Sequence, residues 1–191
     1  RHLGVRVTVL EMFTIMPKDD PELVAVVRRQ LDGDGIEIIE GAAVTGFEKT
    51  PAGVAVSLAN GENGAPRTIE GSHLLVATGR RPNVDGLGLD AAGIHSSDKG
   101  IEVDARLRTT NKRVFAIGDV AGGLQFTHVA GYHAGVVLKN VLFRWPAKTN
   151  HRCVPWVTFT SPELAQVGLI EAEAKKDHAD IRVLRWPYHE N

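Results

Sequence analysis

The sequence predicts an α/β fold in which a parallel β-α-β unit is followed by an antiparallel meander. Residues 5–39 have the order strand, helix, strand, which is typical of parallel strands joined by a crossover helix. Residues 43–70 contain three segments that alternate or run apolar between turn signals, as in a meander. Further strand and helix patterns extend to residue 186.

The β-α-β unit begins with residues 5–10, which carry β-branched side chains and predict a strand. Asp20-Pro21 predicts a helix start, with Asp as the N-cap and Pro at the first helical position. An apolar stripe follows, and Gly33 and Gly35 end the helix. Residues 36–39 then predict a short second strand.

The meander is predicted to contain three strands, at residues 43–49, 53–59 and 67–70. The turn signals between them are Thr50-Pro51-Ala52-Gly53 and Asn60-Gly61.

Buried strands are predicted in the second half of the chain over residues 73–77 and 114–117. The glycine-rich residues 84–100 predict a loop, and an apolar stripe predicts a helix over 127–143. The polar, Pro-containing residues 145–152 indicate a domain boundary.

The C-terminal part is predicted to contain a strand over 154–159, a turn over 162–168, a short helix over 171–178 and a strand over 181–186. Cys153 lies beside the first of these strands, so we expect a packed small residue rather than a nucleophile. Both ends of the chain read as cut, which predicts an internal piece of a longer protein.

The composition excludes several classes of protein. The 22 Lys and Arg against 23 Asp and Glu leave a net charge of −1, without the basic excess that nucleic-acid binding requires. No apolar run is long enough to span a membrane and no targeting segment is present, so we expect a cytoplasmic protein. One cysteine cannot form a disulfide framework, and His128 and His133 lack the further ligands of a metal site.

Glu11 stands at the end of the first predicted strand. In a dinucleotide-binding unit, an acid at such a strand end accepts hydrogen bonds from the adenosine ribose. Its charge also repels a 2′-phosphate, which favours NAD over NADP. An exposed strand-end glutamate is the alternative interpretation.

Two other predicted strands also end in residues suited to ligands. Ala77-Thr78-Gly79-Arg80, with Arg81 after it, places two arginines behind a glycine turn, which suits a pyrophosphate, although a solvated turn is the preferred interpretation of this segment taken alone. Gly118-Asp119 suits ligand hydroxyls, although Asp is also a turn former. A helix beginning near Thr127 would direct free N–H groups at an electron-rich ligand edge.

Together these segments, with residues 154–163, resemble the class I pyridine nucleotide-disulfide oxidoreductases, the family of dihydrolipoamide dehydrogenase, mercuric reductase and glutathione reductase. The resemblance covers essentially the whole chain. It implies partial doubly wound, Rossmann-like FAD- and NAD(P)-binding domains with the meander, and the start of an α+β interface domain. Residues 1–76 resemble the C-terminal part of the NAD-binding domain, 77–147 the returning part of the FAD-binding domain, and 150–191 the start of the dimerisation domain.

The resemblance also implies roles for particular residues. Glu11 matches the ribose-binding acid of NAD-using members, and Val44 a position whose backbone lies by the adenine. Asp119, after Gly118, matches the carboxylate that binds the flavin ribityl chain. Ala77, Thr78, Gly79 and Arg80 match the segment on the nicotinamide side, and Thr127 and His128 match the helix start facing the flavin pyrimidine edge. Thr127 stands where the family usually has alanine, which a backbone contact should tolerate.

The implied parent is a homodimeric enzyme that passes hydride from NADH through FAD to a disulfide or a related small-molecule acceptor. The redox-active cysteine pair would precede residue 1 and the acid-base His-Glu pair would follow residue 191, so no catalytic residue is expected in this chain. We therefore expect the isolated piece to be inactive. The alternatives are an NADH oxidase or ferredoxin reductase type without the disulfide, and a non-catalytic dimerisation fragment.

Overall fold

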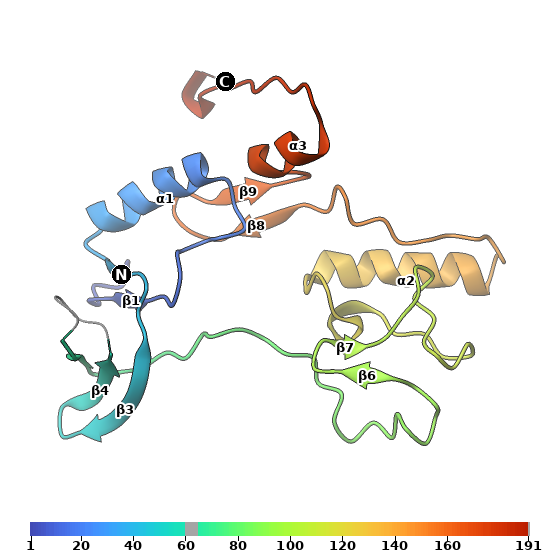
Figure 1. The fold of residues 1–191 in the computed structure, drawn as a ribbon, viewed down its shortest axis with the longest axis horizontal. Helices are drawn as coiled ribbons and strands as arrows, with labels where there is room; N and C mark the ends of the chain where they lie inside the picture. Colours follow the sequence, from blue (N-terminus) through green and yellow to red (C-terminus); the bar gives the residue numbers. More distant parts are fainter. Residues whose placement is uncertain (60–64, 191) are drawn as a thin grey trace. The chain divides into compact units, whose positions relative to one another are not determined.

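The computed structural model describes residues 1–59 and 65–190. The chain divides into two compact units, one formed by Arg1–Val76 with Val157–Asn191 and the other by Ala77–Trp156. Each unit combines helices and strands, so the predicted α/β class is confirmed (Figure 1). The turn predicted at Asn60-Gly61 lies outside the described residues.

The first unit opens with the predicted β-α-β arrangement. Strands β1 (Thr8–Leu10) and β2 (Glu37–Ile39) pair in parallel, with Val9 opposite Ile38. Between them, α1 (Pro21–Gly33) has the expected cap, because the Glu22 N–H donates to Asp20 Oδ1 at 2.9 Å. β1 is shorter than the predicted strand over 5–10, since its ladder begins only where β2 supplies a partner.

The predicted meander is confirmed. Strands β3 (Val44–Thr50), β4 (Gly53–Leu58) and β5 (Arg67–Gly71) form an antiparallel sheet with β4 in the centre. Its buried side chains pack against apolar residues of the parallel pair, so one core joins the two sheets. That core contains Ala42, Val56 and Leu58, with Leu10, Ile39, Val54 and Ile69 packed against them.

The second unit holds a short hairpin and one long helix. Strands β6 (Ser96–Ser97) and β7 (Gly100–Ile101) pair within the segment predicted as a loop, which is therefore more ordered than expected. A 3-10 turn, η2 (Gly118–Ala121), contacts both β7 and helix α2 (Thr127–Val141). The helix confirms the prediction over 127–143, ending two residues earlier.

The C-terminal segment contains β8 (Trp156–Thr158), β9 (Leu164–Gln166), the predicted helix α3 (Glu171–Asp177) and a 3-10 turn, η3 (Tyr188–Glu190). The prediction of only a turn over 162–168 is wrong, because β9 pairs with β8 and buries Leu164. β9 also lies beside α1, as Figure 1 shows.

The predictions of strands over residues 73–77, 114–117 and 181–186 are wrong, because these segments form no strand. Residues 73–77 are exposed and residues 181–186 are exposed except for the half-buried Ile181, with no regular secondary structure in either segment. Residues 114–117 make only an isolated bridge between Phe115 and Arg108. Apolar β-branched composition favours extended backbone, but a strand also needs a neighbouring ladder. No strand within 1–59 or 65–190 supplies one to these segments.

The prediction that Cys153 is packed is also wrong, because its side chain is exposed. It lies in residues 144–155, which form neither helix nor strand.

Replacing Leu58 with alanine should lower the free energy of unfolding by about 3 kcal/mol, because a leucine only 1% exposed leaves a cavity in the shared core. Chemical denaturation of the two proteins measures the difference. The matched control is Leu87→Ala, at a leucine 58% exposed, which should change stability by less than about 0.5 kcal/mol. Equal losses in the two variants would contradict this assignment of the core.

Candidate functional site

In the first unit, the two parallel strands end at one edge, and Glu11 lies at that edge. Its backbone N–H donates to Ile39 O at 2.9 Å, and its carbonyl accepts from the Ala42 N–H at 2.8 Å. The segments that follow β1 and β2 are thereby tied together. The Glu11 carboxylate is half-buried, and its Oε1 accepts from the Phe13 N–H at 3.1 Å.

Val44 is the first residue of β3 and pairs with Leu58. It follows Ala42 by two residues, so the backbone tie to Glu11 places Val44 near the same edge. The sequence did not single out the second acid here, Glu40, which accepts from the Ile15 N–H at 2.8 Å and forms an ion pair with Arg28. Because Glu40 is engaged in this way, Glu11 is the better ligand acceptor.

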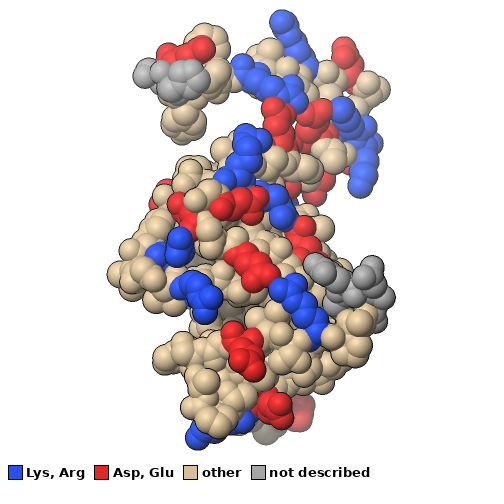
Figure 2. Space-filling view, turned by 90° about the vertical axis from the view of Figure 1, so that its left-hand side faces the viewer, with Lys and Arg blue, Asp and Glu red and all other residues tan. Residues whose placement is uncertain are grey.

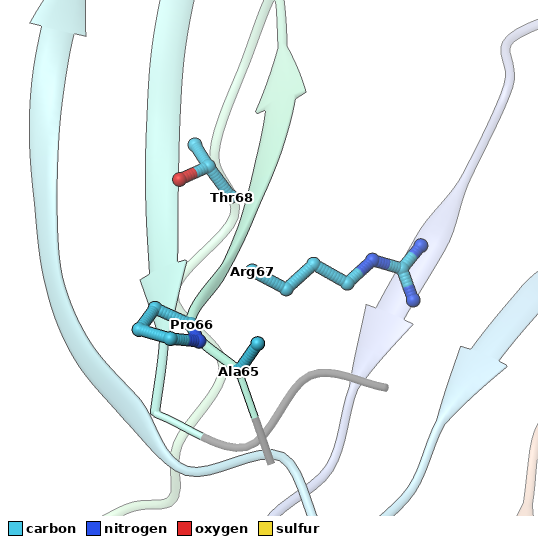
Figure 3. A pocket seen from close by; sticks show the side chains of 4 residues that line it. All are labelled: Ala65, Pro66, Arg67 and Thr68. Carbon is cyan, nitrogen blue, oxygen red and sulfur yellow. The ribbon is translucent and has the colours of Figure 1, made fainter. Parts of the chain in front are cut away.

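An open hollow in the same unit lies beside β5 and is lined by Ala65, Pro66, Arg67 and Thr68 (Figure 3). Its one charged side chain, Arg67, forms an ion pair of 2.8 Å with Glu37. This hydrogen bond, together with one from the Thr8 hydroxyl, holds the pKa of Glu37 below its ordinary value. The hollow includes none of the residues predicted from the sequence, and its arginine is committed to a structural contact.

In the second unit, Gly118 lies close to helix α2. Its φ is +69°, and a Cβ at this position would stand 3.0 Å from the Ala130 Cβ. Its N–H donates to His133 Nδ1 at 3.2 Å. Glycine favours both the left-handed backbone and the close approach to the helix here. The turn that presents Asp119 is therefore held against the helix.

The Asp119 side chain is 49% exposed, and its Oδ2 lies 3.9 Å from Arg80 Nη1. The structure thus brings together two of the predicted strand-end groups. Ala77, Thr78 and Gly79 are exposed and have no regular secondary structure, and no contact from them to Asp119 is recorded within the described residues. Gly79 has a φ of +129°, a backbone conformation that residues other than glycine rarely adopt.

Helix α2 begins at Thr127, where the sequence predicted it. Its N-cap is Phe126, which supplies no side-chain acceptor, and its first turn carries no acidic residue. The imidazole of His128 is engaged elsewhere, stacked on the Phe126 ring with its Nε2 2.8 Å from Pro155 O. The helix therefore begins with N–H groups and a positive dipole end that a ligand could use.

A polar cluster behind this turn was not predicted from the sequence. His133 is buried, and its Nε2 lies 3.0 Å from His151 Nε2. A histidine within an apolar helical stripe was the available signal, since a buried imidazole needs partners. Nothing in the sequence around His151 identified it as that partner.

A metal cluster and a membrane-spanning helix are both absent from the residues that the structure describes. No group of three or more His, Cys, Asp or Glu side chains could hold a metal ion there. No helix in that part is long and apolar enough to cross a bilayer. On the face drawn in Figure 2, basic and acidic side chains lie interspersed.

The chain is similar to known proteins along its whole length. Residues 1–134 match the model of the pyridine nucleotide-disulphide oxidoreductases, and residues 154–191 match the model of their dimerisation domain. The chain is 35% identical to dihydrolipoyl dehydrogenase of Geobacillus stearothermophilus, with all of the chain aligned to 40% of that protein. It is 37% identical to mercuric reductase of Staphylococcus aureus, over 95% of the chain and 33% of that protein.

Solved structures give a similar result. The HOCl-induced flavoprotein disulfide reductase RclA from Escherichia coli superposes with a TM-score of 0.83 at 32% identity, covering 95% of the chain and 41% of RclA. LpdA from Mycobacterium tuberculosis has a TM-score of 0.83 at 30% identity, over 92% of the chain and 38% of LpdA. The chain therefore spans well under half the length of these relatives.

Gly118→Ala should destabilise the protein by about 2–3 kcal/mol, because the new methyl group adds a steric contact with Ala130 to the strain of a positive φ. Gly123→Ala separates the two effects, since Gly123 has a φ of +71° but a Cβ added there would meet nothing within 4 Å. That control should lose only about 1 kcal/mol in denaturant titration. Equal losses would show that the approach to α2 is not tight.

Proposed function

Because the chain belongs to the pyridine nucleotide-disulphide oxidoreductase family, we propose that it is part of a FAD-dependent enzyme that oxidises NADH and reduces a disulfide or a related small-molecule acceptor. The observation that carries the proposal is the Gly118–Asp119 turn held against α2, with the Asp119 carboxylate half-exposed. Relatives named as a flavoprotein disulfide reductase and a dihydrolipoyl dehydrogenase support it.

The residues of the second unit fit a flavin. Asp119 offers carboxylate oxygens to the hydroxyls of a ribityl chain, and its position depends on Gly118. The backbone N–H groups of Thr127 and His128, at a helix start with no side-chain cap, suit the electron-rich pyrimidine edge. Because these are backbone donors, a threonine at 127 serves as well as an alanine.

The residues of the first unit fit the adenosine end of NAD. The half-buried Glu11 carboxylate has one oxygen bonded to Phe13, and its Oε2 accepts no hydrogen bond from the described residues. It is therefore suited to a ribose diol and opposes a 2′-phosphate, which favours NAD over NADP. Val44 would contribute backbone beside the adenine. For Ala77 to Arg80, which belong to the second unit, the family resemblance implies a role on the nicotinamide side.

FAD, when bound, would supply the two-electron chemistry that links NADH to the acceptor. This chain's residues bind and orient: Asp119 and the start of α2 hold the flavin, and Glu11 selects the nucleotide. We assign no proton-transfer or nucleophilic role to any residue of this chain.

We further propose that residues 154–191 take part in a homodimer, since they match the dimerisation-domain model. The same match favours the disulfide class over an NADH oxidase or ferredoxin reductase type. A non-catalytic dimerisation fragment would leave Glu11 and Asp119 without ligands. A reducing compartment suits thiol chemistry and NADH use, which favours the cytoplasm.

Asp119→Asn in the whole protein should weaken FAD binding by about tenfold or more, because a charged acceptor for ribityl hydroxyls is lost. Flavin fluorescence during titration of the apoprotein measures the dissociation constant. Asp90→Asn, at an exposed acid of the same unit, should bind FAD as well as the unsubstituted whole protein, here called the parent. A whole protein that is colourless and cannot be reconstituted with FAD would exclude the proposed function.

Glu11→Ala should reduce the preference for NADH over NADPH by about tenfold, because the ribose acceptor and the repulsion of the 2′-phosphate both disappear. Steady-state kcat/KM with each nucleotide gives the ratio. The control Glu48→Ala removes the same charge from an exposed position on β3 and should leave the ratio unchanged. An unaltered ratio in Glu11→Ala would exclude Glu11 as the selecting residue.

A further inference from the structure

Behind the Gly118–Asp119 turn, two imidazoles form a chain of hydrogen bonds. The Gly118 N–H donates to His133 Nδ1 at 3.2 Å, and His133 Nε2 lies 3.0 Å from His151 Nε2. His133 is only 3% exposed, whereas His151 is exposed. The chain therefore runs from a solvent-accessible ring to the backbone of the turn.

The backbone donor determines the protonation of both rings. Because Gly118 donates to Nδ1, this nitrogen of His133 must accept, and in a neutral imidazole the proton then sits on Nε2. His133 Nε2–H in turn donates to His151 Nε2, so His151 carries its own proton on Nδ1. Every contact has one donor and one acceptor only when both rings are neutral.

Burial lowers the pKa of His133, and the charge that His151 can carry lowers it further. The ring of Tyr132 meets His151 edge-on at 6.2 Å, and its hydroxyl accepts from the Asn150 N–H at 2.8 Å. Asp119 follows Gly118 in the sequence and lies 3.9 Å from Arg80, and Arg152 follows His151, with its backbone N–H donating to Asn150 Oδ1. No carboxylate contact to either imidazole is recorded within the described residues, so neither cation would be stabilised.

We propose that His133 is a positioning residue for the Gly118–Asp119 turn. Through this turn, the His133–His151 pair makes the affinity for a bound flavin depend on pH. The inference rests on the proposed function for its flavin ligand, but the hydrogen-bond chain belongs to the protein alone.

One added proton places two donors face to face. If His151 is protonated, its Nε2–H opposes His133 Nε2–H. If His133 then shifts its proton to Nδ1, that nitrogen opposes the Gly118 N–H instead. The first case loses the contact between the two rings, which supports His133, and the second loses the hydrogen bond that holds the turn itself. Because the pKa of His133 is lowered, this ring stays neutral below the ordinary histidine pKa of about 6.5, and the turn loosens only as the pH falls further.

The first test needs no flavin. Nitrogen-15 NMR of the whole protein should show His133 Nδ1 unprotonated and Nε2 protonated at about pH 7.5. In the parent, protection of the Gly118 amide against hydrogen exchange, corrected for intrinsic rates, should fall at about pH 5.5. It should not fall in His151→Phe, which cannot be protonated at that position. A protonated Nδ1, or equal protection at both pH values in the parent, would overturn the positioning role.

The second test measures the FAD dissociation constant at about pH 7.5 and pH 5.5. The parent should bind about tenfold more weakly at the lower pH, whereas His151→Phe should change by less than about twofold. His133→Gln keeps an amide acceptor for Gly118 without titrating, so it should bind well and show no pH step. His178→Gln, at an exposed histidine of the other unit, is the matched control and should keep the parental step.

The outcomes separate the two claims. A pH step that persists in both His151→Phe and His133→Gln, or one absent from the parent, would overturn the pH dependence. If the parent binds no FAD, the proposed function fails, and the NMR and exchange measurements still decide whether His133 positions the turn.

Discussion

The close approach of the Gly118–Asp119 turn to helix α2 is the constraint on which the candidate flavin site depends. Ala130 lies where a Cβ of residue 118 would point, and His133 accepts the Gly118 N–H. The helix that begins at Thr127 thus fixes the position of the turn in two ways, through the steric contact at Ala130 and through the hydrogen bond to His133. One rigid element therefore sets the position of the carboxylate and of the free N–H groups together, as a preorganised ligand site requires.

The first unit positions its acid by a different means. Glu11 belongs to no helix, and its place comes from backbone hydrogen bonds to Ile39 and Ala42 at the common edge of two parallel strands. The meander supports this edge, because Leu58 of β4 lies in the core that also receives Leu10 and Ile39. Carboxylates in the two units thus reach ligand-accessible positions through separate packing arrangements.

Sequence reasoning succeeded where the signal is local. Asp20-Pro21 marks a helix start through its own side chain and ring, and the alternation within β3 to β5 is a property of neighbouring residues. It failed over 73–77 and 181–186, where apolar composition predicted strands that find no ladder in the described residues. It failed in the opposite sense at β9, where Pro162 and Gly168 flank a short strand that exists because β8 pairs with it.

By itself, the sequence determined the α/β class and the starts of the helices. It also singled out the acids and glycines at residues 11, 79, 118 and 119 as groups that follow apolar segments. These features depend on near neighbours, through caps, turns and periodicity. Only the tertiary structure decided which of them meet: Arg80 with Asp119, and Gly118 with His133 and, through it, His151. Residues 133 and 151 are separated along the chain by the second half of α2 and an irregular segment. Their contact is a consequence of packing, which no local pattern encodes.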